Sequence, residues 1–133
     1  MPCEVIELRG RVIKEGRAEG VALVSDKPIS FYGGVDPETG KILERDHPLY
    51  GESISGKILA FPHGKGSTVG SYILLRLKKR GLAPLAIINE RCEPIIAVGA
   101  IIAEIPAVDQ IDVSEIPQGS RVRVDGCRVI IYP

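Results

Sequence analysis

The sequence has 133 residues, a length that suits one folded domain spanning residues 1–133. Hydrophobic residues make up 44% and charged residues 26% of the chain, which excludes a disordered protein and predicts a packed core. The 17 basic and 17 acidic residues cancel, and this balance argues against a nucleic-acid-binding protein, which usually carries a basic excess.

Targeting and membrane segments are not visible in the sequence. The first ten residues mix charged with apolar side chains, unlike a signal peptide. The longest apolar stretch, residues 94–103, is far too short to span a bilayer. We therefore expect a cytoplasmic protein without a membrane partner.

The cysteines are widely spaced and form no Cys-x-x-Cys pair: Cys3, Cys92 and Cys127. This pattern predicts reduced thiols, and it argues against a zinc or iron–sulfur site contained in this chain. The two histidines, His47 and His63, complete no familiar ligand spacing.

Three strands are predicted near the start of the chain from their β-branched residues, at 5–13, 20–25 and 29–32. Residues 33–42 (GGVDPETGKI) then combine glycines with an Asp-Pro pair, which is typical of turns. A loop of this length in a compact domain is often functional.

A strand at 57–61 precedes the best helix of the sequence, at 68–80. Its apolar residues follow the spacing of a buried stripe: Val69, Tyr72, Ile73 and Leu77. Ser67 is placed to be the N-cap and Gly81 to end the helix in a left-handed conformation.

The last third begins with a predicted strand at 85–88 and an apolar segment at 94–104. Periodicity alone does not separate a buried helix from a strand in that segment, but its length and Pro94 favour a helix. Two strands, 121–126 and 127–133, close the chain with Asp125-Gly126 as a hairpin turn. The order of elements predicts a β-rich α/β domain, a sheet or barrel-like core partly covered by two helices.

The most informative segment is residues 63–68 (HGKGST), which join a predicted strand to a predicted helix. Glycines let a backbone approach a ligand, and a helix N-terminus attracts anions. The nucleotide-binding P-loop is excluded, because the positions five before Gly64 and Gly66 are Leu59 and Phe61. The candidate substrate-binding residues are Gly64, Lys65, Gly66 and Thr68.

Two interpretations of Ser67 remain open from spacing alone. Serine is among the commonest N-caps, so Ser67 can be purely structural. Alternatively, the helix N-terminus and nearby cations can stabilise its alkoxide, provided that water is excluded. No nucleophile elbow accompanies it, which argues against a hydrolase.

Other polar residues have weaker claims to chemistry. His63, four residues before Ser67, is either a partner of the serine or an ordinary loop residue. The acidic residues between the strands are expected to be solvated loop charges: Asp36, Glu38, Glu44 and Asp46. Asn89, Glu90 and Arg91 follow a predicted strand, where polar side chains often line a cleft.

Three blocks in the same order resemble the small subunit of the aconitase X family. They are residues 10–42, residues 64–71 (GKGSTVGS) and residues 99–109 (GAIIAEIPAVD). The resemblance covers nearly the whole chain and implies an aconitase-type swivel domain, a β/β/α module. It also implies that Ser67 is the serine that takes the substrate proton.

The resemblance further implies a heterodimer that is inactive without its large subunit. The large subunit would carry an iron–sulfur cluster of the 4Fe–4S type, with no cofactor in this chain. The implied reaction is dehydration of (R)-5-phosphomevalonate to trans-anhydromevalonate 5-phosphate, and a related branch dehydrates cis-3-hydroxy-L-proline. The shortness of the separate chain favours the phosphomevalonate branch.

A different class of function also fits the residues. A non-catalytic binding or scaffolding β-domain would use Ser67 only as a cap and would need no large partner.

For the catalytic small subunit, in contrast, a partner is expected to dock near Ser67, with Gly33–Gly40 and Ile105–Asp109 at the rim of the site.

Overall fold

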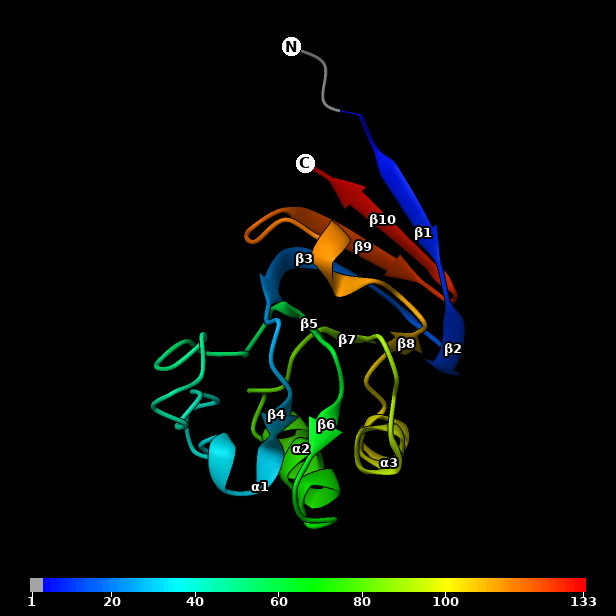
Figure 1. The fold of residues 1–133 in the computed structure, drawn as a ribbon. Coiled ribbons are helices and arrows are strands. Elements are labelled where there is room, and N and C mark those ends of the chain that lie inside the picture. Colours follow the sequence, from blue (N-terminus) through cyan, green and yellow to red (C-terminus); the bar gives the residue numbers. More distant parts are fainter. Residues whose placement is uncertain (1–3) are drawn as a thin grey trace.

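The computed structural model describes residues 4–133, and Cys3 lies outside the described residues. The chain forms three layers, an antiparallel sheet, a mostly parallel sheet and a layer of helices, as Figure 1 shows. The strands are β1 (Ile6–Arg9), β2 (Arg11–Lys14), β3 (Arg17–Val24), β4 (Ile29–Ser30), β5 (Ile58–Phe61), β6 (Gly64–Lys65), β7 (Ala86–Asn89), β8 (Ala107–Asp109), β9 (Arg121–Asp125) and β10 (Arg128–Tyr132). The helices are α1 (Phe31–Gly34), α2 (Gly70–Lys79), α3 (Pro94–Ala103) and the 3-10 turn η1 (Val113–Glu115).

Eight strands form one continuous sheet in the order β1-β10-β9-β3-β5-β7-β8-β2. Strands β3, β5, β7 and β8 are parallel, whereas the remaining neighbours pair antiparallel. The sheet curls, so that its two end strands follow one another in the chain, but β1 and β2 do not pair with each other. The predicted α/β class is therefore confirmed, while the barrel-like core is a curled sheet and not a closed barrel.

Gly10 explains why the single strand predicted at 5–13 is two strands. A Cβ at this position would collide with the carbonyl oxygen of Asp109. The Gly10 N–H donates to the carbonyl of Cys127 at 2.8 Å. Gly10 lies between β1, which pairs with β10, and β2, which pairs with β8. Only glycine fits such a crossing between the two halves of the sheet.

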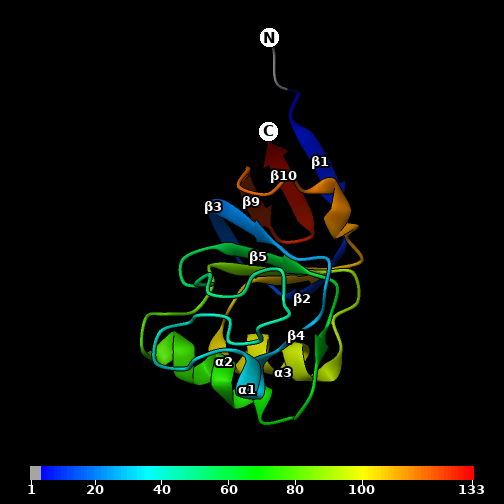
Figure 2. The ribbon, with the colours of Figure 1, turned by 60° about the vertical axis from the view of Figure 1, so that its left-hand side comes forward.

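The central strands separate two hydrophobic cores, because successive side chains point to opposite faces. Leu59, Phe61 and Ile87 pack towards the helices, whereas Ile58 and Ile88 pack against the antiparallel sheet. Figure 2 shows the same layering from another side. Strands β5 and β7, whose residues are all buried, thus lie at the centre of the domain and contribute side chains to both cores.

Helix α2 begins at Gly70, two residues later than predicted. Of the predicted stripe, Leu77 is buried and Ile73 is half-buried, but Val69 and Tyr72 are exposed. The cause is Gly99 of α3, where a Cβ would lie 2.5 Å from the Leu74 side chain, so that the helices approach closely and α2 turns Leu74 inward. The predicted end at Gly81, with φ of 72°, is confirmed.

The second predicted helix is confirmed as α3, with Pro94 in its first turn. The carboxylate of Glu93 caps it, accepting the N–H groups of Ile95 and Ile96, both at 3.0 Å. The final hairpin turns at Gly126-Cys127, one residue later than predicted, because Asp125 still pairs with Arg128. No helix within residues 4–133 is long and apolar enough to cross a membrane.

Candidate functional site

The loop between β5 and α2 lies at the edge where the parallel strands β3, β5 and β7 end. Helices α2 and α3 run side by side from this edge: Ser71 Oγ donates to the Ile95 carbonyl at 2.7 Å near their starts, and Lys78 Nζ donates to the Glu104 carbonyl at 3.3 Å near their ends. Both helix N-termini, with their positive partial charge, therefore meet the loop. Ligands commonly bind at such an edge of an α/β sheet.

The glycines predicted to bind substrate are required by packing. Strand β6 pairs in parallel with β4, with Gly64 opposite Ile29 and Lys65 opposite Ser30. A Cβ on the buried Gly64 would collide with the Glu93 carboxylate and lie 2.5 Å from Ile96 Cγ1. Gly66 has φ of 89°, and a Cβ there would lie 2.5 Å from Ser30 Oγ.

Gly64→Ala is expected to lower the free energy of unfolding by about 1–3 kcal/mol, because an added methyl in a filled space forces its neighbours to move. The displaced groups are the carboxylate that caps α3 and the side chain of Ile96. Urea unfolding of the isolated chain measures the loss. Equal stability of Gly64→Ala and the wild type would contradict close packing of Glu93 and Ile96 around Gly64.

Ser67 lies on the exposed part of this loop. Its Oγ accepts the N–H of Val69 at 3.1 Å, and its carbonyl accepts the N–H of Gly70 at 2.9 Å. These bonds form a turn before α2, whose N-cap position is held by Val69 and not, as predicted, by Ser67. The structural role of the Ser67 hydroxyl is consequently to stabilise a local turn by accepting one backbone N–H.

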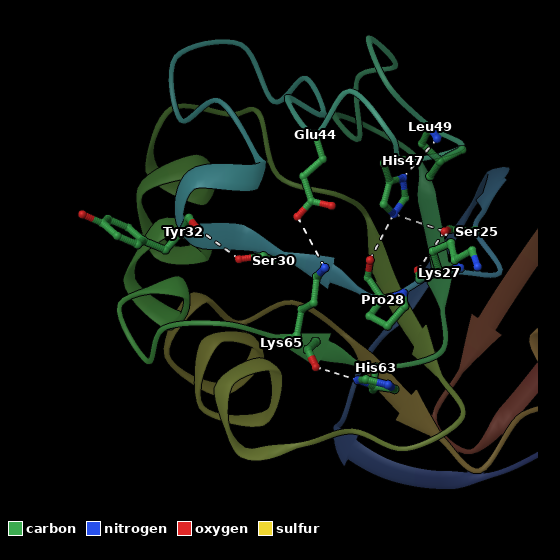
Figure 3. Close-up of polar contacts among 11 residues, drawn as sticks. Ser25, Lys27, Pro28, Ser30, Tyr32, Glu44, His47, Leu49, His63 and Lys65 are labelled. Carbon is green, nitrogen blue, oxygen red and sulfur yellow. Dashed lines mark hydrogen bonds and ion pairs between the residues drawn. The ribbon is translucent and has the colours of Figure 1, made fainter.

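The neighbours of Ser67 in the loop face different surroundings. Lys65 Nζ lies 3.8 Å from Glu44 Oε1, and Figure 3 shows the two side chains pointing towards one another. The exposed Thr68 lines a hollow between α2 and α3. The loop thus carries a hydroxyl directly before a helix N-terminus, which suits an anionic ligand, while its lysine is directed at Glu44.

The two histidines belong to different networks. His63 Nδ1 lies 2.7 Å from the Gly64 carbonyl and must donate to it, which fixes the orientation of the ring at the start of the loop (Figure 3). The buried His47 accepts the N–H of Leu49 at 3.0 Å with Nδ1. Its Nε2 is then the protonated nitrogen, and it lies 3.1 Å from the Pro28 carbonyl. His47 therefore fastens the loop around Leu49 to the segment before β4.

The four acidic loop residues are not grouped as an acid–base pair. Asp36 accepts the N–H of Glu38 at 2.9 Å in a local turn. Glu38 binds Arg76 and Arg80 of α2, at 2.8 and 3.0 Å, and so attaches its loop to the helix. Asp46 is exposed, and Glu44 alone of the four forms an ion pair with a residue of the Ser67 loop.

The polar residues at the end of β7 and directly after it have mainly structural contacts. Asn89 is completely buried, and its Nδ2 donates to the carbonyls of Phe61 and Ile88 at 2.9 and 3.2 Å. The Glu90 carboxylate accepts the N–H of Val113 at 3.3 Å. Asn89 thereby holds the ends of β5 and β7 together just before the Ser67 loop.

The first predicted rim segment, Gly33–Gly40, is partly exposed, whereas the second is almost entirely buried. Tyr32, Gly33, Glu38 and Thr39 are exposed around the first segment. In Ile105–Asp109, every residue except Pro106 is buried, because β8 is an internal strand between β7 and β2. The prediction that Ile105–Asp109 forms part of the rim is wrong.

The described cysteines do not resemble cluster ligands. Burial, assisted by the charges of Asp109 and Glu93, raises the pKa of the Cys92 thiol to about 12, so that it stays protonated at neutral pH. Within residues 4–133, no three His, Cys, Asp or Glu side chains are grouped so that they could hold a metal ion. This part of the chain therefore does not fit an iron–sulfur cluster.

A β/β/α domain with a glycine-rich loop presenting a serine beside two helix N-termini is the kind of module that acts as a swivel domain in aconitase-like enzymes. The chain matches the Aconitase X swivel domain family over residues 7–132 and belongs to that family.

The relatives of the chain are similar over almost their whole length. The chain is 57% identical to the phosphomevalonate dehydratase small subunit of Methanosarcina acetivorans over 91% of this chain and 86% of that protein. It is 55% identical to the protein of the same name from Methanocaldococcus jannaschii, over 91% and 92%. The crystal structure of aconitase X from Thermococcus kodakaraensis, in its holo form, superposes with a TM-score of 0.94 at 53% identity, covering 96% of this chain and 99% of that one.

Sequence reasoning located the loop but missed residues that support it. Ser30, Glu44 and Glu93 each contact one member of the segment 64–66. The only signal for Ser30 and Glu93 was indirect: two glycines separated by one residue indicate that other groups approach the backbone closely.

Proposed function

We propose that this chain is the small subunit of a hydro-lyase that dehydrates (R)-5-phosphomevalonate to trans-anhydromevalonate 5-phosphate. The observation that carries the proposal is the 57% identity, over nine-tenths of the chain, to a phosphomevalonate dehydratase small subunit. The 64–68 loop supports it, because a serine, a lysine and two helix N-termini suit a phosphorylated carboxylic acid.

Ser67 would take the proton from the carbon next to the substrate carboxylate. The Val69 N–H that donates to Ser67 Oγ favours the ionised hydroxyl, as does the positive end of α2. In the free chain Ser67 is exposed, so that water competes for these interactions. The hydroxyl therefore becomes an effective base only when another surface covers the loop.

Lys65 is the proposed contact for an anionic group of the substrate. Its ammonium already lies beside the Glu44 carboxylate, so a phosphate would have to compete with Glu44 for it. Gly64, Gly66 and Thr68 would let the ligand approach the backbone from β6 to the start of α2. These roles, like that of Ser67, are part of the proposal.

The cover would be a large aconitase-like subunit, in a cytoplasmic heterodimer. That subunit would hold the iron–sulfur cluster, which supplies a Lewis acid for the departing hydroxyl. This chain would contribute the base, the loop that positions it and the contact for the phosphate. The isolated chain would accordingly have no turnover.

The test is co-expression of this chain with the aconitase-like large chain of the same organism. The complex should dehydrate (R)-5-phosphomevalonate, and either chain alone should not. Faster turnover of cis-3-hydroxy-L-proline would assign the complex to the other branch of the family. No turnover of either substrate by a stable complex with its cluster content verified would contradict the proposed reaction.

A further inference from the structure

Helix α3 lacks polar side chains throughout Pro94–Ala103 (PIIAVGAIIA). A helix that is apolar on every side is normally buried on every side. Here only its inner face is covered, by α2 and the central sheet, while Val98, Ile101 and Ile102 are 48%, 51% and 38% exposed. Something outside the chain must cover this outer face if α3 follows the usual rule.

The exposed residues of α3 continue onto α2. Tyr72 is 65% exposed and Val69, one turn before it, is 42% exposed. We name the surface formed by Val69, Tyr72, Val98, Ile101 and Ile102 the α2–α3 face. The other exposed apolar residues are spread over several strands and loops, as is ordinary for a protein surface. A group of five on α3 and the first turn of α2 is, in contrast, typical of an interaction surface.

A hollow of about 300 Å³ separates the two helices within this face. Its lining is largely apolar: Thr68, Ser71, Tyr72, Pro94, Ile95 and Val98. The hollow can receive one large side chain from another protein, the usual form of an anchor at an interface. Next to it, Tyr72 also lines a second hollow with Arg76, Lys79 and Arg80. Both arginines are paired with Glu38, so the charge of Lys79 is the one that would suit an acidic group at the edge of that partner.

We infer that the α2–α3 face is the docking surface for the large subunit, which inserts an apolar side chain into the hollow between the helices. This inference rests on the proposed function. Thr68, which lines the hollow, directly follows Ser67, so a chain that covers Ser67 also reaches the hollow. A second copy bound symmetrically here would place the same face of each copy over the other and obstruct both Ser67 loops.

The rim of the site would then include helices α2 and α3 in place of the predicted segment Ile105–Asp109. The buried segment Ile105–Asp109 cannot contribute, whereas α3 exposes its outer face along its length. The docked subunit would thus extend from the Ser67 loop along both helices. Figure 2 shows these helices forming the layer furthest from the chain termini.

The experiment compares single substitutions in the small chain, co-expressed with the large chain of the same organism. Val98→Glu and Ile101→Glu should each raise the Kd of the complex by ~30-fold or more, as expected when charge replaces an apolar anchor. Val21→Glu is the matched control, because Val21 is a 43% exposed valine on β3, in a different layer. All three isolated variants should keep the wild-type circular dichroism spectrum and Tm, since the residues are exposed.

The outcomes separate this inference from the proposed function. If the wild-type complex forms and Val98→Glu and Ile101→Glu bind the large chain as tightly as Val21→Glu does, the docking surface is wrong and the function stands. If the small chain alone forms a dimer that Ile101→Glu dissociates while the complex is unaffected, the face belongs to a second copy and the inference is overturned. If the wild-type chain binds no large chain, both fail.

Discussion

Ser67→Ala should reduce the turnover of the assembled enzyme by ~10²–10⁴-fold, the usual loss when a group that transfers a proton is removed. Stability should change little, because the hydroxyl is exposed and its bond to the Val69 N–H closes a turn outside the helix. Losing a side-chain cap costs about 1 kcal/mol at most in such a position. A large kinetic loss with a small thermal one would distinguish a base from a cap.

The measurement is turnover of the Ser67→Ala complex with its cluster content matched to the wild type. Ser53→Ala is the control, because Ser53 Oγ likewise accepts an N–H two residues on, that of Ser55 at 3.2 Å, and in addition donates to the Thr39 carbonyl at 3.4 Å. Ser67→Thr and Ser67→Asp retain an acceptor for the Val69 N–H but misplace or alter the base, so both should also be poor enzymes. Activity of Ser67→Ala within about threefold of the wild type, far less than a base should lose, would leave Ser67 with a structural role alone.

Elements that depend on the conformational preferences of nearby residues could be predicted from the sequence. Gly81 ends α2 and Pro94 begins α3 because these residues act through their own backbone conformations. The strands β5 and β7 were visible as short apolar runs between turns. The buried face of α2 was predicted only in part: Leu77 is buried, but Val69 and Tyr72 are exposed, because this face depends on Gly99 in another helix.

In the candidate site too, features with a local sequence signal were predictable, and features that depend on tertiary contacts were not. Residues 63–68 stood out because a glycine-rich segment preceded a helix, but the short strand β6 did not, since it exists only by pairing with β4. The contact of Lys65 with Glu44 joins segments that only the fold brings together. Likewise, nothing local indicated that Asp109 would be buried, although it is among the most completely enclosed charged side chains that the structure describes.

Asp109, the last residue of β8, connects this strand to β2 and to the turn that contains Cys92. Its side chain is 1% exposed, and its oxygens accept from Arg11 Nε at 3.0 Å and Arg11 Nη2 at 2.8 Å. One of these oxygens also accepts the N–H of Cys92 at 2.9 Å. The carboxylate therefore holds β2 and the turn before Glu93, the residue that caps α3 and contacts Gly64.

Asp109→Asn should consequently lower the free energy of unfolding by about 2–3 kcal/mol, although the side chain keeps its shape. The amide replaces one accepting oxygen by an NH₂ group that meets an N–H donor, and removing the charge weakens the remaining bonds. This loss lies below the ~3–5 kcal/mol that is typical of a broken buried pair, because the Arg11 side chain stays solvated.

Asp125→Asn provides the control for this substitution. Asp125 also pairs with arginines, Arg17 at 3.3 Å and Arg123 at 3.9 Å, but its side chain is 26% exposed. Its loss should cost less than about 1 kcal/mol, as for surface ion pairs in general. Urea unfolding of the isolated chains decides the matter: equal losses for the two variants would show that Asp109 is no more than a surface charge. A larger loss for Asp109→Asn would instead show that a buried carboxylate at the end of β8, at the same edge of the sheet as the Ser67 loop, holds β2 to the turn before Glu93.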